Sequence, residues 1–234
     1  MADHVRLAYT AELRELEERA LGTLDMVSDA LSKTLDAIEH DDIELAAMIV
    51  ADDDRIDGRY LELHQSLLTL LATQAPVATD LRLIAALLHV MKSVERMGDQ
   101  CVNCAKLIPL TGSNPPRDAG LVRDVVTMGR QVRTMLGQTK RAFLDRDLEL
   151  ARDLVRQDDV VDNLNREAFA TAIRIGDDLD TREWATTMLL IARALERTGD
   201  NAVDIGEQVA FVVTGLFQEF EDASHVGPSS ASKV

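Results

Sequence analysis

Four pairs of acidic residues, each spaced four apart, are the feature of this sequence best suited to chemistry. Two lie in similar stretches, VERMGDQCVN from residue 94 and LERTGDNAVD from residue 195. Residues four apart are neighbours on one helix face, where like charges cost about 0.2–0.5 kcal/mol per pair. Repetition of this cost indicates that the carboxylates have a function. The pairs are Asp53 with Asp57, Glu95 with Asp99, Asp158 with Asp162, and Glu196 with Asp200.

Hairpin geometry predicts that these pairs meet. If consecutive helices fold back antiparallel, residues equidistant from the turn lie side by side. Residues 57 and 95, and residues 53 and 99, are equidistant from Pro76. Residues 162 and 196, and residues 158 and 200, are equidistant from residue 179. Four carboxylates therefore come together twice, and partly desolvated carboxylates repel one another unless cations or protons compensate.

The ligand types in these clusters predict a hard cation. Carboxylate oxygens suit Mg²⁺, Mn²⁺, Ca²⁺ or iron better than zinc, and no histidine joins the clusters. The expected cofactor is thus a divalent or iron cation (Fe, Mn, Mg, Ca or, least suited, Zn) in sites that could be multinuclear. The alternative is that the acids lie on a solvated face and pair with Arg55, Arg96, Arg197 and their neighbours. Gly98 and Gly199, each beside an acid, predict close approach by a neighbouring helix or by bound ions.

Long helices are expected to position these acids. Of the 234 residues, 46% are hydrophobic but only 3% are aromatic, a composition that favours helix packing over sheets. Apolar residues recur at three- and four-residue spacing between the prolines. The expected helices span about 8–39, 42–73, 79–108, 118–144, 147–175 and 181–220.

An internal repeat groups these helices into two units. The stretch DIELAAMIVADDDRID from residue 42 matches DLELARDLVRQDDVVD from residue 147 at an offset of 105, and the glycine-containing stretches match at 101. We therefore predict an all-α protein of two tandem, pseudo-symmetric three-helix bundles with six long helices. The first bundle takes residues 1–110 and the second takes 118–221. Residues 111–117 form the linker, and 222–234 a disordered tail.

Charge and cysteine content restrict the partners and the compartment. The net charge of −16 argues against nucleic acid and leaves proteins or cations as partners. Two cysteines, Cys101 and Cys104, fit a reducing compartment and are interpreted as incidental helix residues. No apolar run reaches the roughly 18 residues that a membrane span needs. A cytoplasmic protein is expected.

Taken together, the motifs resemble the PhoU family. The resemblance rests on the paired acids, on QAPVATDLR from residue 74 and on the doubled Glu-Arg-x-Gly-Asp, and it covers about residues 8–220. It implies two helical bundles, a homodimer, and multinuclear metal clusters held by the eight acids of the four pairs. Asn103 and Asp204, one turn further along, are additional candidate ligands. The second turn, IGDDLDTREW, departs from the pattern because it lacks the proline of the first.

The resemblance also implies a function. Members of this family are negative regulators of the phosphate regulon and of high-affinity phosphate uptake. They act by contact with the ATPase subunit of the phosphate ABC transporter and with a phosphate-sensing histidine kinase, so the chain would reach a membrane complex only through partners. We expect such a regulator, and not an enzyme. The alternatives are a metal-dependent hydrolase of phosphate esters and a metal-free helical scaffold.

Overall fold

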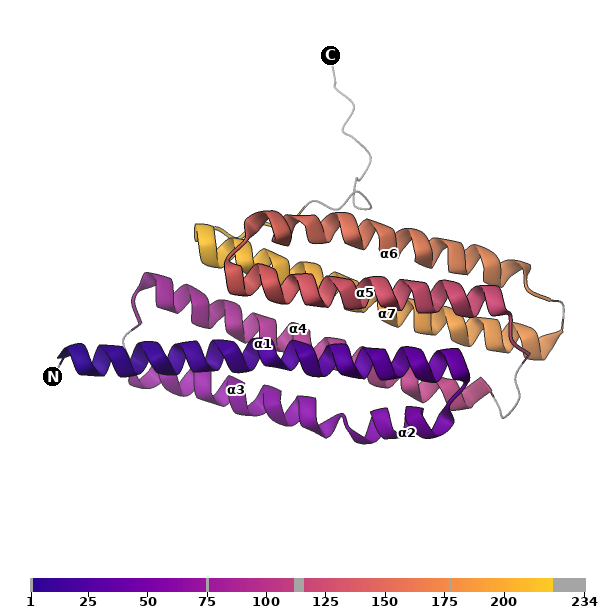
Figure 1. The fold of residues 1–234 in the computed structure, drawn as a ribbon, viewed down its shortest axis with the longest axis horizontal. Helices are drawn as coiled ribbons and strands as arrows, with labels where there is room; N and C mark the ends of the chain where they lie inside the picture. The colour runs from indigo at the N-terminus through magenta and orange to yellow at the C-terminus, as the bar shows by residue number, and fades with distance from the viewer. Residues whose placement is uncertain (1, 75, 112–115, 177, 221–234) are drawn as a thin grey trace, which may run out of the picture.

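The structure, a computed structural model, is all-helical (Figure 1). It describes residues 2–74, 76–111, 116–176 and 178–220, and no strand occurs in these ranges. The predicted fold class is confirmed. The α-helices are α1 (Ala2–His40), α2 (Ile43–Ala51), α3 (Asp54–Thr73), α4 (Ala78–Leu107), α5 (Ala119–Asp145), α6 (Leu148–Arg174) and α7 (Leu179–Thr214), and the 3₁₀ helix η1 (Ile108–Thr111) follows α4.

Aspartate side chains begin four of these helices. The carboxylate of Asp42 accepts a hydrogen bond from the Leu45 N–H (2.9 Å), and Asp178 accepts one from the Thr181 N–H (2.9 Å). Asp118 and Asp147 cap α5 and α6 in the same way. Each cap satisfies an N–H group that has no partner within the helix, which contributes about 1 kcal/mol to stability.

The two bundles pack through their inner helices. In the first, α1 and α4 pack against α2 and α3; in the second, α5, α6 and α7 pack together, while α4 contacts α7 and α1 contacts α5. Helices α4 and α7 run antiparallel, since Arg82 near the start of α4 lies against Gly215 after α7, and the Cys104 thiol donates to the Ile191 carbonyl. Helices α2, α3 and α6 lie on the outside, and the two hairpin turns lie at opposite ends (Figure 1).

The prediction of one continuous helix over 42–73 is wrong. Helix α2 ends at Ala51 and α3 begins at Asp54. The break falls in the sequence ADDDR, where three consecutive aspartates repel one another and can hydrogen-bond nearby backbone groups. A new helix N-terminus at this point is favourable, because its partial positive charge stabilises the aspartates.

The sixth predicted helix is shorter than expected, since α7 ends at Thr214 and not at residue 220. Gly215 adopts a left-handed conformation (φ 77°) and its N–H donates to the Phe211 carbonyl, as is common after a helix end. The chain then folds back along α7. The Phe217 ring stacks on Phe211, and the Phe220 N–H donates to Glu207 (2.7 Å).

The predicted linker and tail fall partly or wholly outside the described residues. The structure describes residues 111 and 116–117 of the linker but not 112–115, and residues 222–234 of the predicted tail are not described. The bundle boundaries remain predictions. None of the described helices combines the length and the apolar character needed to cross a membrane.

Candidate functional site

The break between α2 and α3 brings acidic side chains to the surface of α4. Asp53 lies at the break and makes no capping hydrogen bond of its own, so its carboxylate is not engaged by the α3 backbone. Asp57 lies one turn into α3, and Asp99 lies on α4. Gly98 permits the close approach of the two helices, because a Cβ there would lie 3.2 Å from two side-chain carbons of Ile56. The close approach predicted at Gly98 is confirmed.

Asp53, Asp57 and Asp99 form a group that fits a cation. One carboxylate oxygen from each lies within 4.8 Å of the others. Oxygen ligands surround Mg²⁺ or Ca²⁺ at about 2.0–2.6 Å, so ligands on opposite sides of an ion are about 4–5 Å apart. Three carboxylates at this separation can hold a hard cation after small side-chain movements. We call these three residues the Asp53 group.

The electrostatics of the Asp53 group favour a positive charge. Burial, followed by the negative charges of Asp57 and Asp99, raises the pKa of Asp53 above its ordinary value. Burial, followed by the charges of Glu95 and Asp57, raises the pKa of Asp99. Both carboxylates thus lose stability in their ionised form on folding. A bound cation would reverse this effect.

Glu95, the fourth predicted member, is bound to a lysine in the structure. Lys92 donates to both carboxylate oxygens of Glu95, at 2.9 and 2.8 Å, and its ammonium lies 5.6 Å from the centre of the Tyr60 ring. The hydrogen bond to Glu95 is the first cause of the raised pKa of Lys92. The ammonium group of Lys92 therefore already neutralises Glu95. The charge of Glu95 nevertheless contributes to the raised pKa of Asp99.

The second half arranges its four acids differently. Asp158 is buried against α7 at Gly199, where an added Cβ would lie 2.7 Å from its carboxylate oxygen Oδ1. Glu196 is also buried and forms an ion pair with Arg193. Burial, then Asp200 and more weakly Asp162, raises the pKa of Glu196. The close approach predicted at Gly199 is confirmed.

These four acids are near one another but do not form a second group like the first. Within the described ranges, only the Asp53 group brings three potential ligands within 4.8 Å of one another. The oxygen Oε2 of Glu196 is buried and makes no hydrogen bond with the described residues. Metal binding in the second half is untested and stays a prediction.

The two additional candidate ligands differ in burial and in surroundings. Asn103 is exposed on α4. Asp204 is partly buried, which raises its pKa, and the nearby charges that act on it belong to His89 and Arg96 of α4. It therefore faces the contact between the bundles. His64 packs on the Tyr60 ring at 5.5 Å and does not belong to the Asp53 group.

Both cysteines belong to the core. Cys101 and Cys104 are buried and free, and burial raises the pKa of Cys101 to about 12. A thiol of this kind is protonated at neutral pH and a poor metal ligand. The interpretation of these cysteines as incidental helix residues agrees with their positions.

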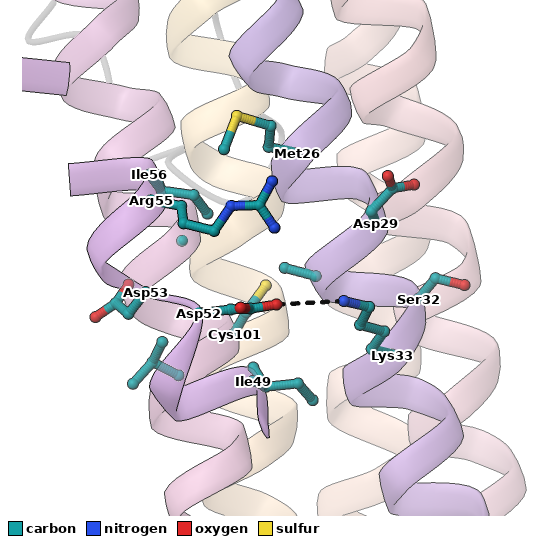
Figure 2. A pocket seen from close by; sticks show the side chains of 13 residues that line it. Met26, Asp29, Ser32, Lys33, Ile49, Asp52, Asp53, Arg55, Ile56 and Cys101 are labelled. Carbon is teal, nitrogen blue, oxygen red and sulfur yellow. Dashed lines mark hydrogen bonds and ion pairs between the residues drawn. The ribbon is translucent and has the colours of Figure 1, made fainter. Parts of the chain in front are cut away.

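A cavity of about 340 Å³ lies behind the Asp53 group, between α1, the α2–α3 break and α4. Its wall includes Asp53, Arg55 and the ion pair between Lys33 and Asp52 (3.5 Å). Figure 2 shows Lys33 reaching across the cavity to Asp52, whereas the carboxylate of Asp53 points away from Lys33. Lys33 of α1 therefore pairs with Asp52 and not with Asp53.

Sequence reasoning missed the basic partners of the two glutamates. Lys92 and Arg193 each lie three residues before a glutamate, a spacing that places the two side chains on one helix face. That spacing was visible in the sequence. The alternative of a solvated face named Arg55, Arg96, Arg197 and their neighbours, and did not single out Lys92 or Arg193.

Comparison with known sequences finds the same family in both halves of the chain. The PhoU domain family matches twice, over residues 23–108 and 125–209. A phosphate-specific transport system accessory protein PhoU homolog of Clostridium acetobutylicum is 29% identical over 219 residues, covering 93% of this chain and 99% of the relative. A PhoU homolog 1 of Methanothermobacter thermautotrophicus is 31% identical over 205 residues, covering 87% of this chain and 90% of the relative.

Solved structures agree with the sequence matches. The phosphate transport system regulatory protein PhoU from Streptococcus pneumoniae superposes with a TM-score of 0.83 at 26% identity, covering 90% of this chain and 99% of that one. PhoU from Pseudomonas aeruginosa superposes with a TM-score of 0.79 at 27% identity, covering 89% and 100%. The similarity therefore extends over both bundles.

Proposed function

This chain belongs to the PhoU family, and we propose that it is an accessory protein that represses phosphate-responsive genes and limits high-affinity phosphate uptake. The observation that carries this proposal is the double match to the PhoU domain. In addition, the chain aligns over nearly the whole length of relatives that are named phosphate-specific transport system accessory proteins. The names of these relatives describe accessory or regulatory proteins, which favours a role through binding over catalysis.

Deletion of the gene in its own host tests this function. A reporter under a phosphate-responsive promoter and the uptake of radioactive phosphate would be measured in phosphate-rich and phosphate-poor medium. We expect the reporter to be active and uptake to be high in rich medium after deletion, and the wild-type gene to restore repression. A deletion strain that still represses the reporter in rich medium would contradict the proposal.

The proposed partners are the ATPase subunit of the phosphate ABC transporter and the phosphate-sensing histidine kinase. A regulator of uptake and of gene expression needs contact with a component of each system. Calorimetric titration of the purified chain with each purified partner measures this contact directly. The proposed homodimer is tested separately by sedimentation of the chain alone.

We further propose that the Asp53 group binds a hard cation. The group supplies three oxygen ligands at a suitable separation, and burial and mutual repulsion disfavour its uncompensated charges. A cation there would neutralise these charges and link the start of α3 to α4. Elemental analysis of protein purified without chelator tests this.

Two matched double variants locate the metal. Asp53→Asn/Asp99→Asn changes the Asp53 group, and Asp158→Asn/Asp200→Asn makes the same chemical change in the second half. We expect the first variant to lose the cation of the Asp53 group and the second variant to keep it. Equal metal content in wild type and the first variant would contradict a site at the Asp53 group.

A further inference from the structure

The outer face of the hairpin between α6 and α7 contains a groove with an unusual composition. Two hollows, each of about 450 Å³, share Leu189 and so follow one another along the hairpin. Their described lining includes four arginines and no acidic residue, in a chain with 25 basic and 41 acidic residues. The arginines are Arg166, Arg174, Arg182 and Arg193. We call this the α6–α7 groove.

Apolar side chains lie between these arginines. Phe169 and Ile173, one turn apart on α6, are 55% and 68% exposed. Thr186 and Leu189 form part of the opposite wall on α7. An exposed cluster of large apolar side chains with charged residues around it is typical of a binding surface, whereas single exposed apolar side chains are ordinary.

The first half lacks this combination at the equivalent positions. By the repeat offsets of 105 for α6 and 101 for α7, the four arginines correspond to Leu61, Thr69, Leu81 and Lys92. Only Lys92 is basic, and it pairs with Glu95 as its counterpart Arg193 pairs with Glu196. The other three arginines have no basic counterpart in the first half, so their basic character is specific to the second half and does not follow from the duplicated fold.

The shape and chemistry of the groove indicate its occupant. From Arg182 to Arg193 it extends over 11 residues of α7, about 16 Å or three helical turns. Grooves between two helices accept a further helix, which here would complete a four-helix arrangement with α5, α6 and α7. Apolar walls need apolar anchors at three- and four-residue spacing, and the exposed Arg166 and Arg174 of α6 can bind carboxylates beside those anchors.

We propose that the α6–α7 groove is the docking site for an acidic amphipathic helix of a partner protein. The inference rests on the proposed function in one respect, since a regulator that acts by contact needs a partner surface. The local charge complementarity favours a short acidic segment. An anionic membrane and a second copy of the chain are less suitable, because the net charge of −16 repels both at long range.

A synthetic helix tests the groove independently of the biological partner. The probe is a fluorescent 14-residue peptide with leucines along one face and glutamates elsewhere, compared with a lysine-for-glutamate version and a scrambled version. Anisotropy with purified full-length chain measures affinity. We expect the acidic amphipathic peptide to bind at least tenfold more tightly than either comparison peptide, with affinity that falls as salt rises.

Matched charge reversals place the binding. Arg166→Glu/Arg174→Glu changes two exposed groove residues, and Arg14→Glu/Arg156→Glu makes the same change at exposed sites outside the groove. We expect the first variant to lose at least tenfold in affinity and the second less than twofold. Phe169→Ala should also weaken binding, which separates docking from simple charge attraction. Equal losses in both double variants would overturn the proposal.

Other occupants are distinguished in the same experiment. Binding of vesicles containing phosphatidylglycerol, or a dimer that the groove variant dissociates, would overturn the proposal in favour of a membrane or a second copy. Displacement of the peptide by inorganic phosphate at constant ionic strength would indicate an anion site instead. If the groove variant loses peptide binding but still represses the reporter, the groove is not the regulatory contact, while the proposed function stands. If deletion leaves repression intact, the function fails whatever the peptide does.

Discussion

Asp99→Asn should stabilise the metal-free protein at pH 7 and weaken its response to metal. In the absence of a cation, the carboxylate of Asp99 faces those of Asp53 and Asp57 within 4.8 Å. Two like charges at that separation in water repel by about 0.9 kcal/mol. Screening at physiological salt, with a length of about 8 Å, reduces this to about 0.5 kcal/mol for each neighbour.

The expected gain is therefore about 1 kcal/mol from two neighbours, which corresponds to an increase in Tm of about 2–4 °C for a chain of this size. Denaturation by heat and by urea, in EDTA, measures it. Asp36→Asn, the same change at an exposed position of α1 outside the group, is the control and should stay within about 0.5 kcal/mol of wild type.

The pH dependence has a definite sign. Folding raises the pKa of Asp99, so the folded state favours the protonated form. The contribution of Asp99 to wild-type stability in EDTA should therefore rise as the pH falls through the folded pKa, until it levels off below the unfolded value of about 3.9; the difference between wild type and Asp99→Asn isolates this contribution. The advantage of Asp99→Asn is largest near neutral pH and disappears at the acidic end of this window.

Added metal should reverse the order of stability. A cation at one hundred times its Kd stabilises the wild type by about 2.7 kcal/mol, whereas the variant has lost one of three ligands and should gain less. Two results would refute the reasoning. One is a variant less stable than wild type in EDTA at pH 7; the other is an equal gain from Mn²⁺ in both proteins.

Four further changes test other parts of the structure. Gly137→Ala, with open space around it, should stabilise by about 0.5–1 kcal/mol, whereas Gly129→Ala should destabilise by about 1–3 kcal/mol because its Cβ would overlap the buried Leu35 side chain; urea denaturation compares the two. Cys101, whose pKa is raised to about 12 by burial, should resist iodoacetamide at pH 8 until the protein is unfolded, and rapid alkylation of the native protein would contradict its position. Asp178→Ala removes the cap of α7 and should cost about 1 kcal/mol in thermal denaturation; no loss would mean that water replaces the cap.

The fold and part of the site followed from sequence periodicity. Helix spacing placed the helical segments, except for the break within 42–73, and distance from Pro76 correctly paired Asp53 with Asp99, because antiparallel helices keep a fixed register around their turn. The break at Asp52 and Asp53 did not follow, since apolar spacing continues across it. Only the local cost of three adjacent aspartates explains it.

Competition between neighbouring charges limited the prediction of ligands. The hairpin rule places Glu95 beside Asp57, but it does not say whether Glu95 faces a cation site or the lysine one turn earlier on its own helix. The α6–α7 groove was also missed. Its arginines are spread over residues 166–193, and only the folded hairpin brings them together around two hollows whose described lining holds no acidic residue.

The difference between the two halves begins at one pair of equivalent positions. Asp52 of the first half corresponds to Gln157 of the second, by the offset of 105. Asp52 pairs with Lys33 of α1 across a cavity, at the point where the helix breaks. Gln157 instead donates to Gln138 of α5 (2.6 Å) and to Asp153 (3.1 Å) on its own helix.

These contacts account for the different positions of the next residue in each half, Asp53 and Asp158. Gln157 accepts from Gln131 of α5 as well (3.2 Å), so α6 is held on α5 at the position where the first half breaks. The uninterrupted α6 then keeps Asp158 buried at Gly199. In the first half the break frees Asp53 from that position, and it joins Asp57 and Asp99. One duplicated hairpin has thereby acquired a three-carboxylate group suited to a cation, while the other keeps a continuous outer helix whose far end carries the arginine groove.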